Sequence, residues 1–426
     1  MKKKVFLFIS MTFILIIGLL VSCKKAEQKA DGPIEIEMWV GAETSNQIQQ
    51  MMDEFMRRNP NIHVKQSPFA ELRDLIRPAI NAGEGPDFYT YDTGPGYLGM
   101  MVNAGLALDF TSYSEKYGWK NRFQDWALEI TTYDGKLYGI ANEVEMLGVF
   151  YNRKMFADLG ITPPSNSYQE FIDICQKILN AGKLPVIIDD RDQWPGFHYE
   201  SIWMNIFAGP QKVKDAIYRT NNVKWTDPDL VMAMDKFAEF ARSKYVNKQI
   251  NALGYDDANA MFVAGESVMR ITGTWMVERF IEGMGDDVGF FYMPPGLPSI
   301  PDAPPGGFGG AIVGNAKTKH PDETAAFIDF FFGDYSCPIW YEGGFIPAVR
   351  NFDVSNLNIS VLLRDIVNEI NDADLLGQNI DVVTGPRVND AAQNYVQQII
   401  DGSMNGAKAM ELKQKAHEED FAAGDK

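Results

Sequence analysis

The stretch DGKLYGIANEVEMLGVFYNRKMFADLG, residues 134–160, decides the fold class of this 426-residue chain. It contains two apolar runs of strand length, 137–140 and 146–151, with Glu143 and Glu145 between them. A helix is predicted after the second run, because an asparagine can cap its start and a glycine can end it in a left-handed conformation. The stretch therefore predicts two strands that flank a pair of carboxylates, followed by a helix.

The residues before this stretch alternate between strand and helix patterns. Strands are predicted at 34–39, 62–65 and 88–91, and helices at 45–58 and 72–82, the second with Pro78 inside it. This order predicts a parallel sheet covered by helices, and it recurs less clearly in the second half of the chain. The sequence thus indicates an α/β protein.

The composition narrows the function classes. The chain is 46% hydrophobic, which is enough for a large core, and its formal net charge is -18. Such a field repels phosphates, so nucleic acid and anionic lipid are not expected as main partners.

The first residues resemble an export signal. Lys2 to Lys4 precede an apolar segment, Val5 to Leu19, that is short for a membrane span. Leu20-Val21-Ser22-Cys23 resembles the lipobox of bacterial lipoproteins, in which the cysteine is acylated and becomes the first mature residue. We expect a signal peptide at 1–22, lipidation of Cys23 and a polar tether at 23–33, with a plain signal peptide or an N-terminal membrane anchor as the alternatives.

Two further cysteines lie in the body of the chain. Cys175 falls within a helical pattern and is predicted to be a small buried apolar residue, and Cys337 lies in the last third of the sequence. Two cysteines do not make a disulfide framework, but a bridge between Cys175 and Cys337 stays open at this point.

Several segments together resemble a known family. Residues 134–160 carry an acidic residue, Glu145, six positions before Tyr151-Asn152, and residues 262–275 run from an aromatic residue through Gly-Glu and Met to Gly-Thr-Trp. The turn GGFIPA at 343–348 follows later. In this order, behind a lipobox, they resemble the family 1 extracellular solute-binding proteins of bacterial sugar ABC importers, the maltose-binding-protein-like proteins, over about residues 34 to 405.

The resemblance implies a two-lobed, periplasmic-binding-protein-like fold of type II, in which each lobe is a sheet flanked by helices and a hinge joins them. We expect the N-terminal lobe at 34–143 plus 293–335 and the C-terminal lobe at 144–292 plus 336–426. The chain should cross between the lobes near Glu143–Glu145, Val288–Pro294 and Gly333–Pro338.

Candidate ligand-binding residues combine aromatic rings with polar side chains, because a sugar packs its C–H face on a ring and needs hydrogen-bond partners at its hydroxyl edge. Most of them follow predicted strands, where ligands bind open α/β sheets. The resemblance places Glu145 and Trp275 in the cleft, Tyr91 is an equal candidate to its neighbour Asp92, and Gly309 lies in a glycine-rich loop that lets backbone approach a ligand. The candidates are Trp39, Glu43, Tyr91, Asp92, Glu145, Trp194, Trp275, Gly309 and Arg387.

The expected function is capture of a small-molecule carbohydrate and its delivery to the permease subunits of an ABC importer. We expect a monomer that is exported and lipid-anchored at the cell membrane or in the periplasm, with no cofactor, no metal and no catalytic residue, because the sequence contains no hydrolase or zinc signature. Three alternatives stay open: a receptor of the same fold for a non-sugar solute, an exported glycoside hydrolase that uses two of the carboxylates, and a surface adhesin or signalling receptor.

Overall fold

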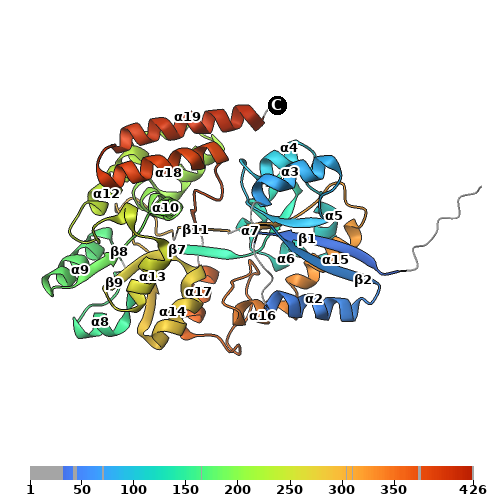
Figure 1. The fold of residues 1–426 in the computed structure, drawn as a ribbon, viewed down its shortest axis with the longest axis horizontal. Coiled ribbons are helices and arrows are strands. Elements are labelled where there is room, and N and C mark those ends of the chain that lie inside the picture. The colour runs from blue at the N-terminus through green and yellow to red at the C-terminus, as the bar shows by residue number, and fades with distance from the viewer. Residues whose placement is uncertain are drawn as a thin grey trace, which may run out of the picture.

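The computed structural model describes residues 32–41, 46–69, 72–164, 166–303, 305–308, 310–372 and 376–424. Figure 1 shows two bodies side by side, one built mainly from the N-terminal part of the chain and one from the middle and C-terminal parts. The predicted signal peptide, Cys23 and most of the tether lie outside the described residues.

The first lobe contains a five-stranded sheet in the described chain, in the order β2-β1-β3-β12-β6. Its strands are β1 (Ile34–Val40), β2 (Ile62–Pro68), β3 (Phe88–Tyr91), β6 (Gly139–Ala141) and β12 (Ala311–Gly314). The first three are parallel, as the alternating pattern predicted, and β12 enters antiparallel between β3 and β6. Because β1 and β3 run in the same direction, Trp39 and Tyr91 come at the same end of the sheet.

The second lobe contains a six-stranded sheet among the described residues, with the path β13-β11-β7-β9-β8 and β10 paired to β7. Its strands are β7 (Val144–Asn152), β8 (Leu184–Ile187), β9 (Ser267–Gly273), β10 (Val288–Phe291), β11 (Pro305–Phe308) and β13 (Gly377–Gln378). A short hairpin of β4 (Thr132–Tyr133) and β5 (Lys136–Leu137) completes the strands described. Figure 1 shows β7 leading from the middle of the molecule into the second lobe.

Helices cover both sheets, as the α/β prediction requires. On the first lobe and at the junction they are α2 (Asn46–Arg58), α3 (Leu72–Ala82), α4 (Leu98–Asn103), α5 (Thr111–Tyr117), α6 (Trp119–Arg122), α7 (Asp125–Glu129), α15 (Pro321–Phe331) and α16 (Ser336–Glu342). On the second lobe they are α8 (Arg153–Asp158), α9 (Tyr168–Asn180), α10 (Pro195–Ala208), α11 (Pro210–Tyr218), α12 (Pro228–Ala241), α13 (Tyr255–Val263), α14 (Val277–Met284), α17 (Val361–Asp372), α18 (Pro386–Asp401) and α19 (Gly406–Gly424), with 3-10 turns η1 (Ile250–Ala252), η2 (Thr274–Met276) and η3 (Gly285–Asp287). The expected cap of α8 is present, since Asn152 Oδ1 accepts from the Met155 N–H at 2.9 Å.

The first predicted crossing is confirmed. β6 ends at Ala141 in the first sheet and β7 begins at Val144 in the second, so Glu143 lies in the connection itself. The Val144 N–H donates to Ile346 O at 2.7 Å, which ties this crossing to the later turn that the sequence had matched to the family.

The second predicted crossing, at Val288–Pro294, is wrong. Residues 288–291 form β10, which pairs antiparallel with β7 inside the second sheet, and the chain passes to the first lobe only between β11 and β12, at 308–311. The sequence did not predict β11 within the proline- and glycine-rich run before β12, because Gly306 and Gly307 have low strand propensity. Those glycines allow close packing: a Cβ at Gly306 would lie 2.5 Å from Met146 Sδ.

The third crossing also comes later than predicted. α16, which begins at Ser336, still packs against α2 and α15 on the first lobe, the turn after it brings Gly344 against Glu278 of α14, and α17 packs on β10 of the second lobe. The complete limits of the two lobes otherwise stay a prediction. Both Cys175 and Cys337 are free and buried, so the open question of a bridge is answered in the negative and Cys175 is the buried apolar residue expected.

Candidate functional site

The site is built around the start of β7, where the chain enters the second lobe. Glu145 is half-buried there, opposite Gly307 of β11. Burial raises the pKa of Glu145 to about 8, and the negative charges of Asp381 and Asp92 act in the same direction. Glu143 is affected as well, because burial and the charge of Glu145 raise the pKa of its carboxyl group.

The charges that act on Glu145 come from both lobes. Asp92 follows β3 of the first lobe, is 6% exposed, and forms an ion pair with Arg73 Nε at 2.6 Å. Asp381 follows β13 of the second lobe, and burial together with Asp92 raises its pKa to about 6, while Arg73 opposes the rise. The structure therefore brings two predicted residues, Glu145 and Asp92, together with Asp381 into one acidic group.

The lobes touch directly beside this acidic group. A Cβ at Gly96 of the first lobe would lie 2.4 Å from the Gly385 Cα of the second, so only a hydrogen side chain permits this approach. Asn389 Nδ2 donates to the Tyr97 hydroxyl at 3.3 Å and to Asp381 O at 3.0 Å. The acidic group thus lies where segments of the two lobes meet.

Four rings of the second lobe form a cluster that we call the aromatic wall, made of Trp194, His198, Tyr255 and Trp275. Trp194 lies 4.4 Å from Tyr255 and 5.2 Å from His198, measured between ring centroids, and His198 lies 4.9 Å from Trp275. Trp275 Nε1 donates to the Tyr255 hydroxyl at 2.6 Å, which closes the cycle. The two tryptophans predicted from sequence are thus neighbours, and both keep part of their rings exposed.

The wall lies next to the entry of β7. Thr274, the residue before Trp275, accepts at Oγ1 from the Met146 N–H at 3.0 Å, and Leu147 pairs with Gly273 across the two strands. The Trp275 ring folds back over Gly273, where a Cβ would lie 1.9 Å from the ring. The Gly-Thr-Trp order therefore has a physical cause, because a side chain at Gly273 would displace the ring.

The remaining predicted residues have individual placements. Trp39 packs on Phe69 at 4.3 Å between ring centroids, within the apolar cluster that also holds Tyr91. Arg387 pairs with Asp420 of α19 at 3.2 Å, so its guanidinium ties two helices of the second lobe together. Glu43 and Gly309 lie outside the described residues.

Sequence reasoning missed several members of the site. His198 lies four residues after Trp194, across the first turn of α10, so its spacing was a usable signal. Tyr255, Arg73 and Asp381 had no local signal, because their roles depend on segments that are distant in the sequence.

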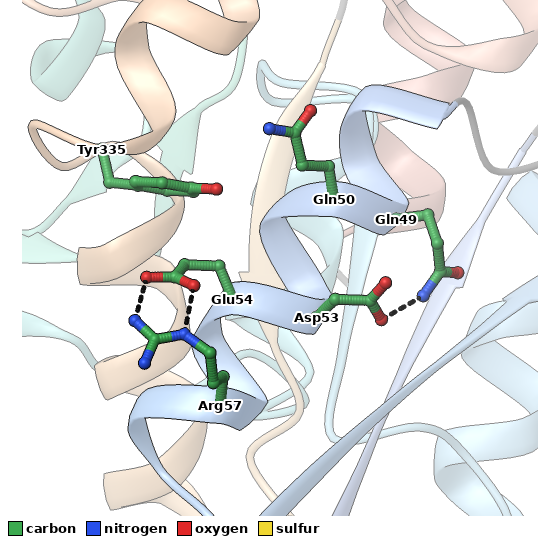
Figure 2. A pocket seen from close by; sticks show the side chains of 6 residues that line it. All are labelled: Gln49, Gln50, Asp53, Glu54, Arg57 and Tyr335. Carbon is green, nitrogen blue, oxygen red and sulfur yellow. Dashed lines mark hydrogen bonds and ion pairs between the residues drawn. The ribbon is translucent and has the colours of Figure 1, made fainter.

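Other surface features do not compete with this site. Among the described residues, no group of His, Cys, Asp and Glu side chains is arranged to hold a metal ion. A hollow of about 420 Å³ lies on α2, lined by Gln49, Gln50, Asp53, Glu54, Arg57 and Tyr335 (Figure 2). Its polar groups bond to one another, since Arg57 Nε pairs with Glu54 at 2.7 Å and Gln49 donates to Asp53 at 2.8 Å. We assign it to a solvated helix face.

Comparison with known proteins identifies the family. The sequence pattern described as "Bacterial extracellular solute-binding protein" matches residues 50–356, which is most of the chain. The chain belongs to this family. The multiple sugar-binding protein of Streptococcus mutans is 22% identical over 319 residues, or 73% of this chain and 74% of that protein. The galactooligosaccharide-binding protein of Bacillus subtilis is 23% identical over 251 residues, covering 58% of this chain and 56% of that protein.

Solved structures support the same fold for this solute-binding protein. A chitin oligosaccharide binding protein superposes with a TM-score of 0.79 at 20% identity, over 92% of this chain and 99% of that one. The two-lobed fold is therefore confirmed, and membership in a family of extracellular binding receptors removes the glycoside hydrolase alternative. Of the helices in the described part of the protein, none has the length and apolar character needed to cross a bilayer.

Proposed function

We propose that this solute-binding protein captures a neutral, hydroxyl-rich carbohydrate between its lobes and delivers it to the permease of an ABC importer. The observation that carries the proposal is the aromatic wall lying beside the acidic group of Asp92, Glu145 and Asp381. A sugar ring offers a C–H face to aromatic rings and hydroxyl donors to carboxylates, and charge-assisted hydrogen bonds of this kind are strong. Sugar-binding relatives support the choice of solute class.

The charge of the site selects among solutes. Arg73 is the cation paired within the acidic group, and its partner is Asp92. Sugar phosphates and uronic acids would face Glu145 and Asp381 without a matching cation, so we expect neutral sugars to be preferred over anionic ones.

The test is a thermal-shift panel of monosaccharides, oligosaccharides and sugar alcohols on protein that begins after Cys23. A solute that binds only the folded state stabilises it by RT ln(1 + [L]/Kd), which is about 2.7 kcal/mol at a concentration of one hundred Kd. If no sugar raises the melting temperature while a polyamine or another solute does, carbohydrate is the wrong class and the same-fold alternative replaces it.

Two substitutions test the location. Trp275→Ala removes a stacking surface, and above the Glu145 pKa of about 8 Glu145→Gln removes a charged acceptor, so each is expected to weaken the best sugar of the panel at least tenfold in calorimetry at pH 9. Glu266→Gln is the matched control, because Glu266 is an exposed residue ahead of β9. Unchanged affinity in both site variants would place the solute elsewhere.

The lipid anchor is part of the proposal. Cys23 follows a lipobox-like segment, and acylation there would keep the receptor beside its permease. Labelled palmitate should be incorporated into the wild-type protein in its bacterial host and not into Cys23→Ala, which should appear in the soluble fraction. Equal labelling of the two proteins would exclude Cys23 as the acceptor.

A further inference from the structure

The polar atoms at the Trp275 edge of the aromatic wall are hydrogen-bonded within the protein. The Trp275 indole N–H is used by the Tyr255 hydroxyl at 2.6 Å. That hydroxyl lies 2.8 Å from Thr272 Oγ1, so it has both a donor and a further partner. The hydrogen-bonding groups at this edge are therefore paired before a solute arrives.

A buried ion pair lies behind Tyr255. Arg270 and Asp189 are both 0% exposed and pair at 2.6 Å between Nη2 and Oδ1. The Arg270 guanidinium carbon lies 5.3 Å from the Tyr255 ring centroid, a cation–π distance, and Arg270 Nε donates to Asn259 Oδ1 at 3.0 Å. Several contacts thus hold Tyr255 in one orientation, and through its hydroxyl they also hold the indole of Trp275.

A second ring of the wall, that of His198, carries no charge. Burial, followed by the charge of Arg270, lowers the pKa of His198 to about 3. His198 is 4% exposed and lies between the two tryptophans, so it is a neutral ring at physiological pH. The wall therefore carries neither a net charge nor a free donor at its Trp275 edge.

We propose that Tyr255 is a positioning and specificity-determining residue: its hydroxyl takes up the Trp275 N–H, so that Trp275 offers the solute a fixed apolar ring face. The inference rests on the proposed function. Under this proposal recognition has two parts: the aromatic wall packs against a contiguous C–H face of a sugar unit, and the acidic group accepts hydrogen bonds from its hydroxyls. A solute that turns a hydroxyl toward the Trp275 ring face would bind more weakly, because that hydroxyl gives up its hydrogen bond to water and finds no partner on the ring.

The test uses Tyr255→Phe in the full protein, which keeps the ring and its contact with Arg270 but removes the hydroxyl. Without solute, the 15N-labelled indole N–H of Trp275, assigned with Trp275→Phe, should shift and exchange with solvent at least tenfold faster in Tyr255→Phe. Tyr245→Phe is the matched control, because the Tyr245 hydroxyl bonds Gln176 at 3.1 Å on the exposed surface and should leave that resonance in place.

Binding gives the second readout, with raffinose, maltotriose and chitotriose as probes. For each probe that binds the wild type, Tyr255→Phe should raise Kd about tenfold, and Trp275→Phe combined with Tyr255→Phe should add little to the stronger single effect, because both act through one hydrogen bond. An unchanged indole resonance, or an unchanged Kd beside a binding wild type, overturns the role of Tyr255 and leaves the proposed function intact. If neither these probes nor any sugar of the thermal-shift panel binds the wild type, the proposed function fails, and with it the part of this inference that concerns solute recognition, even where the resonance shifts.

Discussion

Replacing Glu145 with Gln should make the ligand-free protein more stable at alkaline pH while it weakens solute binding. Glu145 is half-buried and its pKa is raised from the ordinary 4.5 to about 8, by burial first and then by Asp381 and Asp92. In the unfolded chain the carboxyl group loses its proton near pH 4.5, while in the folded protein it keeps the proton until about pH 8. Stability is therefore undiminished below pH 4.5 and falls as pH rises through this window.

The magnitude follows from the same numbers. One pKa unit corresponds to about 1.4 kcal/mol, so a rise from 4.5 to about 8 sets an upper bound of about 5 kcal/mol on the cost of ionised Glu145. Water entry and relaxation reduce this cost, and we expect about 2 kcal/mol at pH 9. Glutamine resembles the protonated acid, so the difference at pH 5 should be close to zero.

The assay is denaturant unfolding of the ligand-free wild type, Glu145→Gln and the exposed control Glu266→Gln at pH 5, 7 and 9. The stability advantage of Glu145→Gln should grow with pH, and the control should follow the wild type throughout. An advantage that is the same at pH 5 and pH 9 would show that the effect comes from packing and would refute the electrostatic reasoning.

Three other perturbations have defined outcomes. Gly96→Ala places a Cβ 2.4 Å from backbone of the opposite lobe, so it should raise the Kd of the best sugar severalfold without changing stability to denaturant. An unchanged Kd would show that this contact is absent from the bound state. Lys413→Met should lower the free energy of unfolding by about 3–5 kcal/mol, because it leaves the fully buried Glu200 without its ion-pair partner at 2.9 Å. Adding Glu200→Gln should restore much of this loss, and a Lys413→Met variant as stable as the wild type would contradict the reasoning. X-ray scattering of ligand-free protein should give a larger radius of gyration at pH 9 than at pH 5, because ionised Glu145 and Asp381 repel Asp92 of the other lobe, and equal radii would argue against this repulsion.

The sequence predicted those features that local patterns encode. Alternation along 34–40 predicted β1, the two apolar runs around Glu143 and Glu145 predicted β6 and β7, and the family resemblance added that the chain crosses between lobes there. The Gly-Thr-Trp order predicted a ring at a strand end, which the close contact of Trp275 with Gly273 explains. Each of these signals lies within a few residues.

The missed features depend on distant partners. The sequence did not predict β11, because its glycines have low strand propensity. They are there because a side chain would clash with Met146 and Asn379. Asp381 could not be predicted as a site residue, because its place in the acidic group depends on Asp92, which is almost three hundred residues away and on the other lobe. The pairing of Arg387 with Asp420 was equally invisible, since a helix near the C-terminus provides the partner.

The acidic group links solute binding to the arrangement of the lobes. Asp92 belongs to the first lobe, Asp381 to the second, and Glu145 to the strand that enters the second lobe at the crossing, so bringing the lobes together concentrates negative charge and removes water from it. The closed arrangement of the empty protein is disfavoured by this charge above the pKa of Glu145. Sugar hydroxyls can donate to these carboxylates, and a solute that donates to carboxylates of both lobes therefore stabilises closure by its differential interaction with the two arrangements. The same carboxylates that lower the stability of the empty receptor thus make closure depend on the solute.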